Sequence, residues 1–183
     1  MAEYRAFDPK VEINGKTVMS ALDAVWNKKV ALEILARHGI QNIKPNSWYP
    51  MQSFLNVLRE ISGEFGDREL FAVGRKIPFW ADFPKIKNLH DGLSKIDIAY
   101  HNNHRGGEIG HYRYTKLAEN KGRMICDNPY PCRFDQGIFH GLAENFDIKD
   151  LKITHREISL CRRYGNILCD YILEWETEAS SQS

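Results

Sequence analysis

One helical segment lies between two pairs of strand-like segments, and this order constrains the fold more than any other feature. Within the stretch FDQGIFHGLAENF, the residues Phe134, Ile138 and Leu142 recur at helical spacing. The stretches EIGHYRYTKL and RMICDN before it, and DLKITHREISLC and NILCDYILEW after it, alternate in the manner of strands, with AENKG and RRYG as turns. The sequence therefore predicts two antiparallel hairpins with one helix between them.

The first part of the chain follows a helical period instead. A helix is predicted over VMSALDAVWNKKVALEILARHGI, a second over PNSWYPMQSFLNVLREISGEFG and a third over DRELFAVGRKI. Together with the hairpins, this predicts an α+β fold in which N-terminal helices pack on a mostly antiparallel four-stranded sheet. We expect a single domain over residues 1–183, with an N-terminal arm over about 1–16 and a frayed tail over about 177–183.

Composition narrows the possible partners. Lys+Arg 25 against Asp+Glu 24 leaves a formal charge of +1, which argues against nucleic acid and against an anionic membrane surface. No apolar run reaches the roughly 18 to 20 residues of a membrane span, and the first residues lack a secretory pattern, so we expect a cytoplasmic protein. In a reducing compartment, four cysteines favour structural thiols, catalysis or metal binding over disulfides.

The positions of the cysteines suggest a metal site. Cys161 and Cys169 each stand four residues from Gly165, so a hairpin that turns at this glycine would place them face to face across the ladder. Two such thiolates suit one tetrahedral zinc ion, and Cys132, at a predicted helix start, could be a third ligand. Three side chains compete for the fourth position: Glu157, His155 and Cys126. The alternative is that these cysteines are small apolar residues of an ordinary core.

The segment that opens with NPYPCRFDQGIFHGLAENF resembles the carboxy-terminal half of vinyl-4-reductase domains, which also occur in hydrocarbon-binding proteins and in sensory domains of aromatic-responsive bacterial activators. The resemblance is carried by a cysteine that opens a helix with the pattern G-x-x-x-G-L, then by two cysteines eight positions apart before an aromatic-rich strand. It implies zinc at Cys132, Cys161 and Cys169. The family's acidic ligand corresponds to Ile158 here, and a β-bulge could deliver the neighbouring Glu157 instead.

The same resemblance implies a fold shared with trafficking-complex subunits of the TRAPP type and with heme nitric-oxide-binding domains, in which helices over a sheet enclose an apolar cavity. Two aromatic-rich segments, SWYP and IPFWADFP, and the strand EIGHYRYTKL would line it. The expected ligand-binding residues are Trp48, Trp80, Phe83, His90, His111 and Tyr112. The alternative is that the aromatic rings fill a core and that His111 lies on an exposed polar face.

A heme site is considered because NLHDGLSKIDIAY resembles the helix that carries the proximal histidine in heme nitric-oxide-binding domains, which makes His90 the candidate axial ligand. Those domains hold the heme propionates with a Tyr-x-Ser-x-Arg motif, and the corresponding stretch here, CDNPYPCR, lacks it. The sequence therefore argues against heme. His101 and His104 form an H-x2-H pair in a Gly-rich loop, where solvated histidines are the ordinary case.

The leading hypothesis is a domain that binds and senses a small hydrophobic or aromatic ligand, contains a structural zinc site, and acts through a homodimer or a signalling partner protein. One alternative is a reductase or helper enzyme that acts on a tetrapyrrole. The other is a heme-based gas sensor that uses His90. Because G-x-G-x-x-G, a nucleophile elbow and H-E-x-x-H are all absent from the sequence, we expect binding rather than catalysis.

Overall fold

A four-stranded antiparallel sheet forms one layer of the molecule. The computed structural model describes residues 3–156 and 161–176. The strands lie in the order β4-β5-β7-β6, and each neighbouring pair is antiparallel. Their bounds are His111–Ala118 for β4, Lys121–Asp127 for β5, Lys152–Arg156 for β6 and Cys169–Glu174 for β7. The predicted α+β class and the four-stranded sheet are confirmed.

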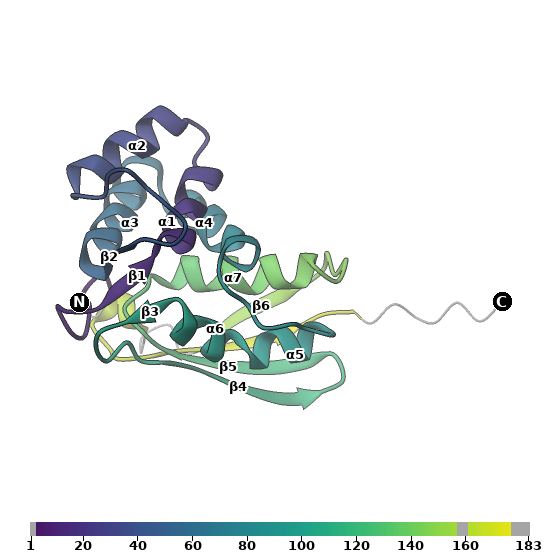
Figure 1. The fold of residues 1–183 in the computed structure, drawn as a ribbon. Coiled ribbons are helices and arrows are strands. Elements are labelled where there is room, and N and C mark those ends of the chain that lie inside the picture. The colour runs from purple at the N-terminus through teal and green to yellow at the C-terminus, as the bar shows by residue number, and fades with distance from the viewer. Residues whose placement is uncertain (1–2, 157–160, 177–183) are drawn as a thin grey trace.

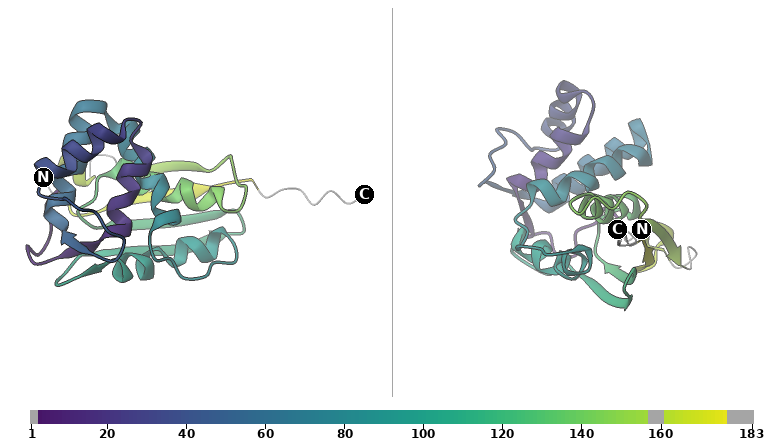
Figure 2. Two further views of the ribbon diagram at one scale, coloured as in Figure 1. Left: turned by 45° about the horizontal axis from the view of Figure 1, so that its top comes forward. Right: turned by 90° about the vertical axis from the view of Figure 1, so that its right-hand side faces the viewer.

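Helices cover the sheet and extend beyond it. Their bounds are Gly15–Ala24 for α1, Lys28–Arg37 for α2, Met51–Phe65 for α3, Asp67–Trp80 for α4, Leu89–Ser94 for α5, Ile96–Asn102 for α6 and Cys132–Glu144 for α7. In Figure 1, α7 runs along the sheet and the group α1 to α4 lies beyond it, while α5 and α6 lie beside β4. The two further views in Figure 2 show the same separation of the N-terminal helices from the sheet.

A second, smaller sheet was not predicted. It consists of β1 (Glu12–Asn14), β2 (Trp48–Pro50) and β3 (His104–Arg105), in the order β2-β1-β3. The predicted N-terminal arm over residues 1–16 is therefore wrong for its last residues, which belong to β1 and to the start of α1. There, β1 is paired on both sides and Asn14 accepts a hydrogen bond from the Thr17 amide, which starts α1. Strands of two or three residues are too short to show alternation in a sequence.

The first predicted helix is in fact two. After α1 ends, the side chain of Asn27 accepts hydrogen bonds from the amides of Lys29 and Val30 and begins α2. Trp26 lies between the two helices with 91% of its surface exposed. The apolar spacing that suggested one helix therefore counted a residue that takes no part in the buried face.

Helix α4 continues further than predicted. It runs through Pro78 to Trp80, and its C-cap is Ala81. A proline inside a helix removes one backbone hydrogen bond, but here only two helical residues follow it, so the disruption is confined to the last turn. The segment IPFWADFP therefore includes the last turn of a helix.

Helices α4 and α7 approach each other through glycines. A Cβ atom added at Gly74 would overlap the carbonyl oxygen of Phe134, and one added at Gly137 would overlap that of Phe71. Gly141 is in the same position against Arg75. The G-x-x-x-G-L pattern of α7 thus has a structural reason, because only residues without a side chain allow backbone contact at this distance. This contact fixes the N-terminal helices on α7 and, through it, on the sheet.

Candidate functional site

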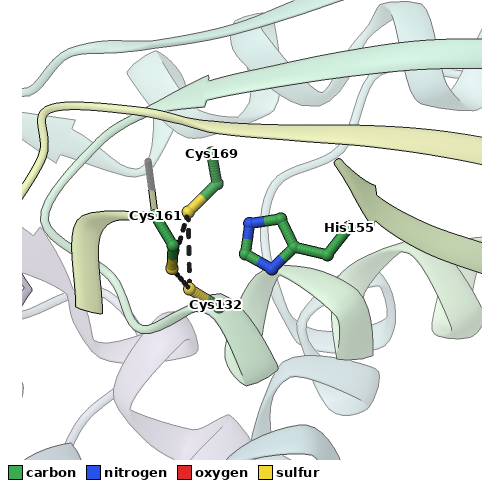
Figure 3. Close-up of side chains that lie close together, drawn as sticks. All are labelled: Cys132, His155, Cys161 and Cys169. Atoms are coloured by element: carbon green, nitrogen blue, oxygen red, sulfur yellow. Dashed lines mark hydrogen bonds between the residues drawn. The ribbon is translucent and has the colours of Figure 1, made fainter. Parts of the chain in front are cut away.

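Three cysteines from separate elements come together at one end of the sheet. Cys132 is the first residue of α7, Cys169 is the first residue of β7, and Cys161 precedes a short 3-10 helix, Arg162–Tyr164. The Cys132 sulfur lies 2.9 Å from that of Cys161 and 3.4 Å from that of Cys169, and the last two are 3.5 Å apart. Figure 3 shows the three sulfur atoms facing one another. We call Cys132, His155, Cys161 and Cys169 the thiol cluster.

The route by which Cys161 and Cys169 meet differs from the predicted one. The expectation that they are opposite each other in a ladder is wrong, because the ladder partner of Cys169 is Cys126 on β5. Gly165 does make a turn, with φ of +95°, but it ends the 3-10 helix in the segment between the paired strands β6 and β7 and is not the tip of a tight hairpin that starts at Cys161. The turn brings Cys161 to Cys169 from outside the sheet.

The fourth member of the thiol cluster among the described residues is His155, from β6. Its ligand atom and the three sulfur atoms all lie within 4.8 Å of one another. The Nε2 atom of His155 is buried and has no hydrogen-bond partner among the described residues. In Figure 3 the imidazole ring faces the sulfur atoms. Glu157, the acidic ligand expected from the resemblance, lies outside the described residues.

Hydrogen bonding divides the protons of the thiol cluster unequally. The Cys132 sulfur lies 2.9 Å from a carboxylate oxygen of the buried Glu3, and the Cys132 amide donates to the same oxygen. The hydrogen bond to Cys169, then burial and the charge of Glu3, raise the pKa of Cys132. The same bond, together with His155 and the positive charge of Arg162, holds the pKa of Cys169 below its usual range. These contacts favour the thiolate form of Cys169 over that of Cys132, and a thiolate is the form that binds metal.

A buried ion pair connects the thiol cluster to the interior. Arg162 donates from Nε to the Cys169 sulfur at 3.3 Å and pairs with Asp135 on α7, and both charged side chains are fully buried. Asp135 also accepts a hydrogen bond of 2.6 Å from the hydroxyl of Tyr112. Burial raises the pKa of Asp135 to about 6, against the opposing effect of Arg162. Tyr112 lines the cavity described next, so one chain of contacts joins that cavity to the thiol cluster.

The cavity lies between the helices and the beginning of the sheet, and we call it the tyrosine pocket. Its lining consists of Thr17, Ile77, Ala81, Phe83, Ile96, Ala99, Tyr100, Asn103, His104, Tyr112, Tyr130, Phe134 and Ile138. Its volume of about 30 Å³ holds roughly two water molecules. The rings of Tyr100 and Tyr112 meet edge to face with centroids 5.2 Å apart, and Tyr130 stacks on Phe134 at 4.7 Å. The pocket is apolar, with a few polar atoms at fixed positions.

His104 is the imidazole of the tyrosine pocket. Its Nδ1 atom lies 2.6 Å from the backbone carbonyl of Tyr100, which can only accept, so Nδ1 carries the proton. Its Nε2 atom therefore keeps a lone pair, which accepts a hydrogen bond of 2.8 Å from the hydroxyl of Tyr130. Burial lowers the pKa of His104 to about 4, so the ring is neutral. A neutral imidazole whose Nδ1–H bonds a backbone carbonyl is the form that ligates metals through Nε2.

Only two of the six residues predicted to bind a ligand line the tyrosine pocket. Phe83 and Tyr112 line the tyrosine pocket, whereas Trp48, Trp80, His90 and His111 are not part of its lining. Trp48 stacks under the guanidinium of Arg105, and Trp80 donates to Asp23 on the surface. His90 contacts the hydroxyl of Tyr114 and the carbonyl of Glu119, and His111 is 43% exposed. These four side chains do not converge with Phe83 and Tyr112 on the tyrosine pocket.

Comparisons with known proteins identify the fold. No protein-family model matches the sequence, and a search of curated proteins also gives no match. Among solved structures, an H-NOX protein from S. oneidensis, crystallised in the Fe(II) ligation state, superposes with a TM-score of 0.72 at 16% identity, over 92% of this chain and 98% of that chain. The chain has the H-NOX fold.

Two further structures with the H-NOX fold bear on the cofactor. One is an oxygen-binding H-NOX domain related to soluble guanylate cyclases, in its oxygen complex, with a TM-score of 0.67, 13% identity, and coverage of 92% of this chain and 96% of that chain. The other, from work on heme distortion in the H-NOX family, has a TM-score of 0.64 at 13% identity and the same coverage. The prediction that argued against heme is therefore wrong, because proteins with the H-NOX fold include heme proteins.

The resemblance stated from the sequence holds only in part. Its heme nitric-oxide-binding branch agrees with the H-NOX fold, whereas none of the comparisons shows a vinyl-4-reductase relationship. Zinc is not named by any of the structures above, and zinc at the thiol cluster stays a prediction. No helix among the described residues has both the length and the apolar character needed to cross a bilayer.

His104, expected to be a solvated loop histidine, is buried instead. Among the residues of the tyrosine pocket that are absent from the predicted ligand-binding set are Tyr100, His104 and Tyr130. In the sequence they belong to a short helix, a Gly-rich loop and a Pro-rich turn, and none of these segments shows a period. The tyrosines of YHNNH and NPYP were the only sequence feature that could have indicated these pocket residues. Their convergence depends on the pairing of β3 with β1, which the sequence did not reveal.

Proposed function

We propose that this chain is a small-molecule sensing domain that holds heme in the tyrosine pocket, with His104 as the axial ligand. The observation that carries the proposal is the state of His104, which is buried and neutral and has its Nε2 lone pair directed at a phenol of the pocket wall. The H-NOX fold supports the choice of heme, since solved structures with this fold include Fe(II) and oxygen complexes.

The donor set of the pocket suits heme. Histidine and tyrosine are both axial ligands of heme proteins, and the pocket presents His104 together with Tyr100, Tyr112 and Tyr130 in apolar surroundings. When bound, heme would supply an iron centre for a diatomic gas. The chain's own contribution is to orient the imidazole through the Tyr100 carbonyl and to exclude water from the pocket.

The size of the pocket sets a condition on this function. A cavity of about 30 Å³ is far below the roughly 300 to 1,000 Å³ of typical ligand sites, so heme can enter only if the walls separate. Because α4 is held against α7 by backbone contact, we expect the wall formed by α6 and β4 to be the part that moves. The Tyr130 hydroxyl must also leave His104 Nε2.

The experiment is reconstitution of the protein with hemin under reducing conditions, followed by absorption spectroscopy. We expect a saturable, one-to-one Soret band that shifts when nitric oxide or carbon monoxide is added. His104→Ala should lose the band, and His90→Ala, which removes the imidazole outside the pocket, should keep it. A band abolished only by His90→Ala would refute the assignment of His104, and the absence of a saturable band in the parent protein would refute the heme proposal.

A second candidate is a sensor for a small apolar ligand, with no macrocycle in the pocket. The observation that favours it is the pocket volume, which suits a molecule of a few atoms without any movement of the walls. Phe83 and Tyr112 keep the role predicted for them in either case. A homodimer or a signalling partner would then carry the response.

The thiol cluster is proposed as a separate structural site for one soft metal ion. Its Cys3His donor set is that of closed, tetrahedral structural sites, and the unpartnered Nε2 of His155 supports it. His155 replaces Glu157 in the predicted ligand set. The site would tie β6, β7 and the start of α7 together.

A further inference from the structure

A second group of metal-ligand side chains lies on the outer surface of α6 and β4. Asp97 and His101 stand one helical turn apart on α6, and His111 is the first residue of β4. The His111 Nδ1 atom is 3.3 Å from one carboxylate oxygen of Asp97, and the His101 Nδ1 atom is 3.8 Å from the other. The two imidazole rings stack with centroids 5.1 Å apart and planes 30° apart.

Hydrogen bonds orient these three side chains. Asp97 Oδ1 accepts from the backbone amide of Tyr112 at 2.8 Å, which fixes the carboxylate against β4. His101 Nδ1 donates to the backbone carbonyl of Asp97 at 2.8 Å, so its Nε2 atom keeps a free lone pair. One ligand atom from each residue can be chosen so that all three lie within 4.8 Å of one another. The side chains are about one-third to two-fifths exposed, which leaves room for water as further ligands.

We propose that Asp97, His101 and His111 form a binding site for a divalent transition-metal ion. Two imidazoles and one carboxylate favour ions such as Ni²⁺, Co²⁺, Zn²⁺ or Cu²⁺ over Mg²⁺ or Ca²⁺, which prefer oxygen ligands. Three protein ligands at the surface leave coordination positions open to solvent. The site is distinct from the thiol cluster, which shares none of its residues and whose donors are mainly sulfur.

The metal would join two elements that also form the wall of the tyrosine pocket. In each element, a proposed metal ligand is next in sequence to a tyrosine that lines the tyrosine pocket: Tyr100 precedes His101, and Tyr112 follows His111. A bound ion would therefore hold α6 to β4 at the place where Tyr100 meets Tyr112 inside. The geometry of the site is independent of what the pocket holds, so the proposal does not rest on heme.

The test is calorimetric titration of untagged, heme-free protein with Ni²⁺. We expect one equivalent of Ni²⁺ at this site in the parent, in addition to any metal at the thiol cluster. His101→Ala and His111→Ala should each lose at least tenfold in affinity, and Asp97→Asn, which keeps an acceptor for the Tyr112 amide, should lose less. His38→Ala is the matched control, because His38 is a part-exposed histidine beside a carboxylate, Glu60, without a second imidazole. This variant should bind Ni²⁺ as the parent does.

Co²⁺ spectra on the same variants distinguish this site from the thiol cluster. Co²⁺ bound to nitrogen and oxygen ligands lacks the thiolate-to-cobalt charge-transfer band that sulfur ligands produce. Thermal melts establish that each variant is folded. Ni²⁺ binding that is equal in the parent, His101→Ala and His111→Ala, or no stoichiometric binding in the parent, would overturn the proposal.

Discussion

Arg162 and Asp135 form an ion pair in which neither charged side chain reaches solvent. Arg162 also donates to the backbone and side-chain oxygens of Asn128, and Asp135 accepts from Tyr112. A buried charge destabilises the folded protein unless its partners compensate it. The pair is therefore the point at which the thiol cluster, α7 and the tyrosine pocket depend on one another.

Breaking this pair should destabilise the protein strongly. Loss of one partner of a buried pair typically costs about 3 to 5 kcal/mol, because the other charge stays buried without compensation. We expect losses of this size in the free energy of unfolding for Arg162→Met and for Asp135→Ala, measured by denaturant titration. The double variant should lose less than the sum of the two. Arg163→Ala, next in sequence but in an exposed pair with Asp67, should cost less than about 1 kcal/mol.

Stability should depend on pH through His104. Burial lowers its folded-state pKa from 6.5 to about 4, so the unfolded chain takes up this proton first as the pH falls. The contribution of the neutral ring is therefore complete above pH 6.5 and is lost as the pH falls from about 6.5 to about 4, by on the order of 3 kcal/mol. Unfolding measured across this range in the parent and in His104→Gln should give a difference curve with this slope.

Asp135 makes stability change with pH in the opposite direction from His104, which is why a difference curve is needed. Its folded-state pKa is raised to about 6, so its contribution is present at low pH and is lost as the pH rises through 6. Subtracting the His104→Gln curve from that of the parent removes this effect, provided that the Arg162 pair is intact in both. A flat difference curve between pH 4 and 6.5 would contradict the assignment of a neutral buried imidazole.

The glycine contact between α4 and α7 should not accept a methyl group. Gly137→Ala places a Cβ atom on the Phe71 carbonyl, so we expect a loss of at least about 2 kcal/mol from backbone displacement. Gly63→Ala is the control, because Gly63 lies within α3 and nothing lies within 4 Å of its added Cβ. That variant should gain up to about 1 kcal/mol from helix propensity. Chemical denaturation of both variants decides the point, and equal effects would remove the packing explanation.

The thiol cluster predicts metal content that depends on its own cysteines. Elemental analysis of protein never exposed to chelators should find about one equivalent of a soft metal, with Cys169→Ser losing it. Cys126→Ser is the comparison, because Cys126 is equally buried and pairs with Cys169 in the ladder but is not a member of the thiol cluster. If Cys126→Ser loses as much metal as Cys169→Ser, the ligand set is wrong.

Periodicity was sufficient for the regular parts of the fold. The alternation in β5 and the helical spacing in α7 each span enough residues to reveal which face is buried, and together with the strand-like sequence of β4 they predicted the sheet and the helix between its hairpins. Breaks in long helices were harder. Asn27 caps α2 through a local hydrogen bond that leaves the apolar spacing of its neighbours almost unchanged.

The candidate sites were predictable only where one residue type carried the signal. Cys132, Cys161 and Cys169 could be grouped from the sequence, although their approach to one another depends on the 3-10 turn at Gly165. Positions 155 and 157 share a face in an ideal strand, so alternation alone could not choose between His155 and Glu157. His104 meets Tyr130 across 26 positions through pairings of very short strands, for which the sequence holds no period.

The backbone contact between α4 and α7 also determines how force passes through the molecule. Side chains between two helices can change rotamer when either helix is displaced, whereas two backbones in direct contact have no rotamer to change. Gly74, Gly137 and Gly141 place α4 and α7 in such direct contact. A displacement of α7 that begins at the thiol cluster would thus be passed on directly to α4, and the N-terminal helices would move together with α7.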